Sequence, residues 1–245
     1  MRGPHAGVDE AGRGPALGPL VVCSLCVPSE DVAFLQESGA RDSKSLSPGK
    51  RGEIYTKIIK EYENRDWGLG IVVCEPSRID YNSVNSDLNS LEVELFAEAL
   101  ELCTNPIPNG SLKVDACDVD EARFGSRLSN VLGERWGGWD IDSRHGMDSR
   151  DVVTSAASII AKVERDSKIH ELSEELGIDL GSGYPSDPKT RRAVSKLVSG
   201  ELPHECLRWS WKTVSRAWTE FHGTPVPSRS GDGKIASQST LGDWG

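Results

Sequence analysis

The chain has 245 residues and a formal net charge of −10, and 37% of its residues are hydrophobic. This length is enough for one or two domains with a sizeable core, and the acidic balance argues against a protein that binds nucleic acid through general positive charge. No run of apolar residues is long enough to span a bilayer, and the N-terminus has no charged segment followed by an apolar one. We therefore expect a soluble, cytoplasmic protein without a membrane segment.

The first predicted element is a short strand that ends in two adjacent carboxylates, Asp9 and Glu10. Glycines follow at once, with Arg13 between Gly12 and Gly14. Carboxylates at a strand end suit a hard divalent cation, while a Gly-Arg-Gly turn offers donors to a phosphate or a sugar. Because side chains alternate along a strand, both carboxylates can reach one metal ion only if the chain bends there.

Three glycines from position 12 onward loosely resemble a dinucleotide-binding fingerprint. Their spacing is wrong for it, and Pro15 and Pro19 stand where the helix of that motif should begin its hydrogen bonding. The residues that follow predict a second strand instead, so we reject a dinucleotide site.

The remaining elements are predicted from periodicity and turn residues. Strands are predicted over residues 6–9, 18–27, 67–74, 112–116 and 139–143. Helices are predicted over residues 30–38, 48–64, 87–102, from 119 onward, 148–165 and 187–199, with a last helix that ends near residue 221. We expect Ser29 to cap the first helix and Pro76 to stop the third strand.

A further carboxylate, Asp115, ends the fourth predicted strand and so repeats the arrangement of Asp9. Asp118 and Asp120 are expected to line the next loop, because acids are favoured in the first turn of the helix that follows. Asp148 begins another predicted helix, whose dipole would orient its carboxylate.

Several acids near Asp148 compete with it for a role at a site. They are Asp140, Asp142 and Asp151, of which Asp142 ranks second. His145 also lies in this loop, either as a catalytic residue or as a loop residue whose hydrogen bonds are satisfied locally. The sequence leaves both alternatives open.

Cysteines and basic residues add two expectations. The cysteines lie mostly inside apolar runs, at positions 23, 26, 74, 103, 117 and 206, so buried reduced thiols are expected.

Residues 189–216 carry seven Lys and Arg residues against two Glu residues, a local charge of +5. Such a segment fits either a phosphate-backbone contact or a solvated helix face. Three tryptophans in or just after this segment, at positions 209, 211 and 218, are expected to pack a small lobe.

Residues 7–15, Gly-Val-Asp-Glu-Ala-Gly-Arg-Gly-Pro, closely resemble the opening of the ribonuclease HII family, the type 2 ribonucleases H. Further motifs of that family follow in order at residues 42–46, 114–116, 148, 155–162 and 181–186, in an archaeal style. The resemblance implies an α/β, ribonuclease H-like fold: a mixed five-stranded sheet with flanking helices and a C-terminal helical lobe. The predicted number of strands agrees, whereas the mixed strand order does not follow from periodicity.

The same resemblance implies the site residues. Four acids would be catalytic and would hold two Mg²⁺ or Mn²⁺ ions about 4 Å apart: Asp9, Glu10, Asp115 and Asp148. Substrate would be bound by Gly12, Arg13, Gly14, Lys44 and Tyr184. From the sequence pattern alone, Tyr184 could equally be a core residue.

The implied reaction is metal-dependent hydrolysis of the RNA strand of RNA–DNA hybrids, with a cut 5′ to single ribonucleotides in duplex DNA. One ion would generate the attacking hydroxide and the other would stabilise the leaving 3′ oxygen, leaving a 5′-phosphate and a 3′-hydroxyl. Ribonucleotide excision repair and RNA primer removal during replication are the implied roles. The alternatives are a junction-resolving nuclease on the same fold and a noncatalytic, clamp-associated adaptor that binds nucleic acid.

The expected domains are a catalytic core over residues 1–180, a helical substrate-binding lobe over 181–222 and a flexible tail over 223–245. The tail ends with Gln238, Leu241 and Trp244, which resemble a peptide that binds a sliding clamp (PCNA). Gly245 stands where that pattern usually has a second aromatic residue. We expect a monomer that binds RNA–DNA hybrid, ribonucleotide-containing duplex and the clamp.

Overall fold

The structure is a computed structural model that describes residues 3–40, 45–103, 109–229 and 235–236. The chain divides into two compact units. Unit 1 contains Met1–Ala11, Val21–Val73 and Asn89–Arg165, and unit 2 contains Gly12–Leu20, Cys74–Leu88 and Asp166–Gly245. The predicted domain limits at residues 180 and 222 divide the chain differently and stay a prediction.

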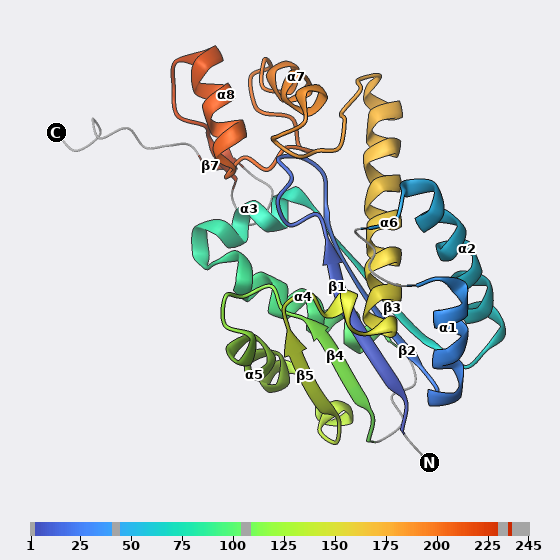
Figure 1. The fold of residues 1–245 in the computed structure, drawn as a ribbon. Helices are drawn as coiled ribbons and strands as arrows, with labels where there is room; N and C mark the ends of the chain where they lie inside the picture. The colour runs from blue at the N-terminus through green and yellow to red at the C-terminus, as the bar shows by residue number, and fades with distance from the viewer. Residues whose placement is uncertain (1–2, 41–44, 104–108, 230–234, 237–245) are drawn as a thin grey trace. The chain divides into compact units, whose positions relative to one another are not determined.

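Unit 1 is built on a five-stranded sheet with the strand order β3-β2-β1-β4-β5 (Figure 1). β1 pairs with β2 in the antiparallel sense, whereas the pairs of β1 with β4 and of β4 with β5 are parallel. The prediction of a mixed five-stranded sheet is confirmed. Parallel pairing places the carboxyl ends of β1 and β4 at the same edge of the sheet. The strands are β1 (His5–Ala11), β2 (Leu20–Val27), β3 (Gly68–Cys74), β4 (Ser111–Asp115) and β5 (Asp140–Arg144).

Capping residues mark the starts of several helices. Ser47 accepts a hydrogen bond from the backbone N–H of Lys50, and Asp187 accepts one from the backbone N–H of Lys189. The α-helices of the described residues are α1 (Val32–Ser38), α2 (Pro48–Asn64), α3 (Pro76–Asn85), α4 (Leu88–Leu102), α5 (Glu121–Val131), α6 (Val152–Leu176), α7 (Pro188–Leu197) and α8 (Lys212–His222). None of these helices is long and apolar enough to cross a membrane.

Two predicted helix features are wrong, and one helix was not predicted. Ser29 does not cap α1 but lies in a 3₁₀-helix, η1 (Ser29–Asp31), and its hydroxyl donates to the carbonyl of Gly3. Pro76 begins α3, a helix that was not predicted. A proline fits at the first helical position, because the N–H that it lacks would have no partner there. α6 runs to Leu176 rather than to residue 165.

The two faces of the sheet carry different helices (Figure 1). On one face, alternate residues of β2 such as Cys23 and Leu25 join a buried cluster with residues of α1, α2 and α6. On the other face, the hydroxyl of Ser24 donates to the carbonyl of Ala99 in α4 at 2.7 Å. The period of two along the strand therefore separates the two layers.

Gly7 allows α6 to approach β1 closely. A Cβ atom at this position would lie 2.3 Å from the backbone nitrogen of Thr154, in the first turn of α6. Only glycine fits at such a distance. This contact places the start of α6 alongside the strand that carries Asp9.

Unit 2 contains α3, α7, α8 and the C-terminal part of α6. Its core includes Leu17, Leu180, Leu207, Trp209 and Trp218, all buried. The expectation that the tryptophans pack a small lobe is confirmed for these two.

The segment after α8 is held to unit 2 at several points, which differs from the flexible linker predicted there. The indole N–H of Trp218 donates to the carbonyl of Pro225 at 3.1 Å. The Arg229 guanidinium forms an ion pair with Asp80 at 3.1 Å. β6 (Ser228–Arg229) also pairs with β7 (Ile235–Ala236) in the antiparallel sense.

Candidate active site

Three buried carboxylates meet at one edge of the sheet in unit 1. Asp9 lies near the end of β1, Asp115 is the last residue of β4, and Asp148 lies in the 3₁₀-helix η4 (Met147–Ser149). Each offers a carboxylate oxygen, and these oxygens lie within 4.8 Å of one another. The exposed fractions of the three residues are only 3%, 9% and 1%. The structure therefore brings together three of the four predicted acids.

The loop before Asp148 is tied to the end of β4. One carboxylate oxygen of Asp115, Oδ1, accepts hydrogen bonds from the backbone N–H groups of Gly146 at 2.8 Å and of Met147 at 3.4 Å. Asp148 follows directly in η4 and precedes α6, which begins at Val152. Asp148 is thus placed by this loop, and the prediction that it begins the long helix is wrong.

Glu10 follows Asp9 directly in β1, and a side-chain hydrogen bond with Glu10 is among the contacts that raise the pKa of Asp9. The pairing of β1 with β2 continues in register through Glu10 and Ala11. The Sγ atom of Cys117 lies 3.3 Å from a carboxylate oxygen of Glu10. Glu10 is outside the three-acid group, and its role as a metal ligand stays a prediction.

Burial raises the pKa of Asp9 well above its usual value, and the neighbouring charge of Glu10 raises it further. Two groups on α6 act in the opposite direction: the charge of Lys162 and a hydrogen bond with Ser158 both lower the pKa of Asp9. Lys162 in turn donates to the hydroxyl of Ser158. Neither residue was predicted as a site residue, although both lie within the motif at 155–162.

The donor set fits a hard divalent cation. Mg²⁺ and Mn²⁺ prefer oxygen ligands, and carboxylates from separate elements can surround one ion. Burial raises the pKa of Asp9 and the charge of Glu10 raises it further, so repulsion between neighbouring carboxylates adds to the cost of burial. A bound cation would relieve that repulsion.

Asp142, the second-ranked competitor of Asp148, and Asp118 both have basic partners. Asp142 pairs with Lys113 at 3.0 Å and with Arg144 at 2.7 Å. Asp118 pairs with Arg123, which lowers the pKa of Asp118 to about 2. The loop role expected for Asp118 agrees with this pairing.

Three more residues of the loop region have local partners. Asp120 caps α5, accepting from the backbone N–H of Arg123 at 2.9 Å. Asp151 contacts His5 at 2.8 Å. His145 lies 2.6 Å from the carbonyl of Asp118 and 3.2 Å from a carboxylate oxygen of Glu121. These contacts favour the loop reading of His145 over the catalytic one.

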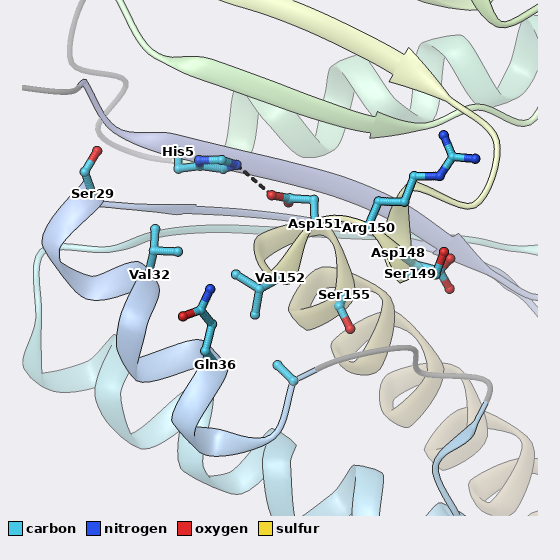
Figure 2. A pocket seen from close by; sticks show the side chains of 11 residues that line it. His5, Ser29, Val32, Gln36, Asp148, Ser149, Arg150, Asp151, Val152 and Ser155 are labelled. Carbon is cyan, nitrogen blue, oxygen red and sulfur yellow. Dashed lines mark hydrogen bonds and ion pairs between the residues drawn. The ribbon is translucent and has the colours of Figure 1, made fainter.

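A cavity of about 600 Å³ adjoins Asp148 (Figure 2). His5, Gln36, Arg150 and Ser155 are among its lining residues. The Ser155 hydroxyl is buried and has no hydrogen-bond partner among the described residues. A polar cavity beside an acid of the group can admit water or part of a substrate.

Unit 2 contains the predicted substrate turn together with the tyrosine. Gly12 has a φ of +95°, which glycine adopts without strain. A Cβ atom on Gly14 would lie 3.5 Å from ring carbon Cε1 of Tyr184, so the ring rests against this turn. Tyr184 is 40% exposed, which excludes the alternative of a core residue. Lys44, Gln238, Leu241 and Trp244 lie outside the described residues.

The cysteines of the described residues are free thiols. Five of them are buried, and Cys117 is half-buried. The expectation of buried reduced thiols therefore holds for all but Cys117.

A family model matches most of the chain, including the three acids. The family model described as Ribonuclease HII matches residues 6–214. The chain belongs to the ribonuclease HII family. Ribonucleases HII are metal-dependent endoribonucleases, so family membership makes this chain an endoribonuclease of that kind. The resemblance drawn from the sequence motifs is confirmed.

Relatives of the ribonuclease HII family match most of the chain. Ribonuclease HII of Pyrobaculum arsenaticum is 44% identical over 210 residues, which cover 86% of this chain and 96% of the relative. The crystal structure of the ribonuclease H2 of Pyrococcus horikoshii is 34% identical, with a TM-score of 0.78, and the match covers 90% of this chain and 100% of that one. A structure of the PCNA:RNase HII complex of Archaeoglobus fulgidus matches with 35% identity and a TM-score of 0.71, covering 87% and 96% of the two chains. The predicted ribonuclease H-like fold is confirmed.

Proposed function

We propose that the protein hydrolyses the RNA strand of RNA–DNA hybrids and cuts 5′ to single ribonucleotides embedded in duplex DNA. The products would be a 5′-phosphate and a 3′-hydroxyl. The observation that carries this proposal is the meeting of Asp9, Asp115 and Asp148 at the sheet edge. No side chain there is needed as a nucleophile, because water can attack the phosphodiester.

Asp9, Asp115 and Asp148 would hold Mg²⁺ or Mn²⁺, and we propose Glu10 as the fourth acid of a two-ion site. Bound ions would supply an activated water and neutralise charge on the leaving oxygen. The chain itself prepares the site. The N–H groups of the Gly146 loop fix the carboxylate of Asp115, and Lys162 offsets part of the negative charge around Asp9.

Specificity requires a group that senses the 2′-hydroxyl, since only this group separates RNA from DNA. We assign this task to the turn of Gly12, Arg13 and Gly14 and to Tyr184. The contact of the Tyr184 ring with Gly14 supports a shared surface. Lys44 would contact a substrate phosphate.

Family membership and the solved complex of a relative support a proposal for the cellular role. The relative from Archaeoglobus fulgidus has been solved in a complex with PCNA. We propose that this chain also binds a sliding clamp, through Gln238, Leu241 and Trp244, and acts as a cytoplasmic monomer. It would remove ribonucleotides and RNA primers from DNA. Its core, lobe and tail would divide at residues 180 and 222.

The test is cleavage of an end-labelled DNA duplex that contains one ribonucleotide, in Mg²⁺. Wild type should cut 5′ to the ribonucleotide, and Asp115→Asn should not. Asp142→Asn is the matched control, because Asp142 lies on the neighbouring strand and pairs with Lys113 and Arg144 instead. Wild type that cuts only long hybrids would contradict the role of the turn. Wild type that cuts neither substrate would favour the adaptor, and cleavage of all-DNA junctions would favour the resolvase.

A further inference from the structure

Arg208 is a fully buried arginine whose guanidinium is bound to the Gly-Arg-Gly turn of unit 2. Its side chain donates to the carbonyl oxygens of Gly12 at 2.6 Å, of Arg13 at 3.0 Å and of Gly18 at 3.1 Å. All three guanidinium nitrogens take part, one for each carbonyl. The exposed fraction of Arg208 is 0%. These contacts join residues 190 to 196 positions apart in the sequence.

The backbone around Arg208 makes a second set of contacts with the same segment. The backbone N–H of Arg208 donates to the carbonyl of Ala16 at 2.9 Å, and Leu207 forms a bridge with Leu17. On the other side of this segment, the N–H of Ala16 donates to the carbonyl of Gly183 at 2.8 Å, next to Tyr184. The turn and the tyrosine loop therefore share one hydrogen-bonded network with Arg208.

Arg208 itself is held in place by a buried carboxylate. Asp80 accepts hydrogen bonds from the backbone N–H groups of Trp209 and Ser210, each at 2.9 Å, and from the Ser210 hydroxyl at 2.7 Å. The Trp211 ring lies 5.0 Å from the guanidinium carbon of Arg208. Asp80 thus fixes the backbone next to Arg208 through contacts that do not involve the turn, and the Trp211 ring lies beside the guanidinium.

The contacts with Gly12 and Arg13 determine where the donors of the turn point. A trans peptide unit is planar, with its C=O and N–H on opposite sides, and no peptide bond in the described residues is cis. When Arg208 holds the carbonyl of Gly12, the N–H of Arg13 must point away from Arg208. The carbonyl of Arg13 fixes the N–H of Gly14 in the same way. These two N–H groups are the donors that the proposed function needs.

We propose that Arg208 is a positioning residue that aims the Arg13 and Gly14 N–H groups at the ribonucleotide and so sets the preference for ribonucleotide over deoxyribonucleotide. This inference rests on the proposed function of the turn. Lysine cannot replace arginine in this role. Its ammonium is a point donor, whereas the guanidinium presents a rigid fork that can serve three carbonyls at once.

The experiment measures binding in the Asp115→Asn background, which prevents cleavage. Dissociation constants are compared for a duplex with one ribonucleotide and for the all-DNA duplex of the same sequence, in Mg²⁺. With Arg208 intact, the ribonucleotide duplex should bind more tightly. Arg208→Lys should lower this preference about tenfold, which corresponds to about 1.4 kcal/mol. Arg208→Gln, which buries no charge and is expected to fold, should lower it as well.

Trp218→Phe is the matched control. Trp218 is a buried side chain of unit 2 whose indole N–H donates to the carbonyl of Pro225 at 3.1 Å and whose ring stacks on His222, so these contacts lie outside the turn and Arg208. This variant should lower the melting temperature but leave the preference unchanged. An unchanged preference in both Arg208 variants, or an equal loss of preference in the Trp218 variant, would overturn the proposal. If the protein with Arg208 intact binds both duplexes equally, the proposed recognition of the 2′-hydroxyl by the turn is wrong, whatever the Arg208 variants show.

Discussion

The backbone N–H of Gly146 donates to the carboxylate of Asp115 at 2.8 Å, and this bond joins the end of β4 to the loop that carries Asp148. Gly146 has a φ of +64°, in the left-handed region. This conformation turns the chain directly after that N–H, so that the N–H of Met147 also reaches the Asp115 carboxylate, at 3.4 Å. Two acids of the group are therefore placed relative to each other by a single glycine.

Gly146→Ala is expected to lower both stability and activity. A side chain in the left-handed region costs about 1–2 kcal/mol, so the free energy of unfolding should fall by that amount. If the loop relaxes instead, Asp148 moves away from Asp115, and a displacement of about 1 Å can reduce the rate about a hundredfold. Urea unfolding and single-turnover cleavage measure the two effects.

Gly177→Ala separates strain from placement of the acid. Gly177 has a φ of +61° and open space around its Cα, so alanine there meets the same backbone strain. It lies just after α6 and holds no carboxylate. Equal losses of cleavage in the two variants would contradict the role assigned to Gly146.

Gly7→Ala is expected to separate α6 from β1. The new methyl group would fall 2.3 Å from the nitrogen of Thr154, and overpacking of this kind costs about 1–3 kcal/mol. Thermal unfolding should show the loss, and cleavage should fall because Asp9 lies on the displaced strand. Gly49→Ala, where nothing lies within 4 Å, should not destabilise the protein. A neutral Gly7→Ala variant would refute the close contact.

Local sequence patterns predicted the sheet well. The alternation of apolar residues and the positions of Gly and Pro were enough for all five strands. α3 was not predicted because a proline is an ambiguous signal. Pro76 can end a strand, and it can also begin a helix. The mixed strand order depends on pairing between distant segments, which periodicity cannot reveal.

The candidate site was predictable where its residues end strands. Asp9 and Asp115 stand out on that ground, whereas Asp148 came from the family resemblance. The bend that would bring Asp9 and Glu10 to one metal ion stays a prediction, while β1 keeps its register with β2 through Glu10. The roles of Lys162 and Arg208 could not be inferred from local sequence, since Asp9 and the Gly-Arg-Gly turn lie far from them along the chain.

Ser155→Ala is expected to stabilise the protein. The Ser155 hydroxyl is buried beside the cavity at Asp148 and has no partner among the described residues, and such a group costs about 1–3 kcal/mol. Removing it should raise the free energy of unfolding by about that amount. If the hydroxyl serves substrate or an ordered water, cleavage should fall at the same time.

Ser158→Ala should have the opposite effect on stability. Its hydroxyl accepts from Lys162, so alanine removes a partner from a cation and should lower the free energy of unfolding by about 1–3 kcal/mol. Urea unfolding of both variants compares the two serines on one helix. A destabilised Ser155→Ala variant would show that its hydroxyl has a partner in solution.

The raised pKa of Asp9 predicts how pH and metal affect stability. Burial and the charge of Glu10 raise this pKa in the folded state. As pH rises above about 3.9, the ordinary value, the unfolded chain releases its proton first, so folding loses stability until the raised pKa is passed. The melting temperature of metal-free wild type, relative to that of Asp9→Asn, should therefore fall with rising pH. Mg²⁺ should restore it in wild type more than in the variant.

Asp142→Asn provides a control of opposite sign. Burial raises the pKa of Asp142, but hydrogen bonds from Arg144 and Lys113 outweigh this and lower it overall. Asp142 therefore adds stability above its ordinary pKa, and this stability is lost as pH falls. The difference in melting temperature between wild type and Asp142→Asn should rise with pH. The difference between wild type and Asp9→Asn should fall with pH. If both differences have the same sign, or if Mg²⁺ stabilises wild type and Asp9→Asn equally, Asp9 is not the carboxylate whose charge the metal neutralises.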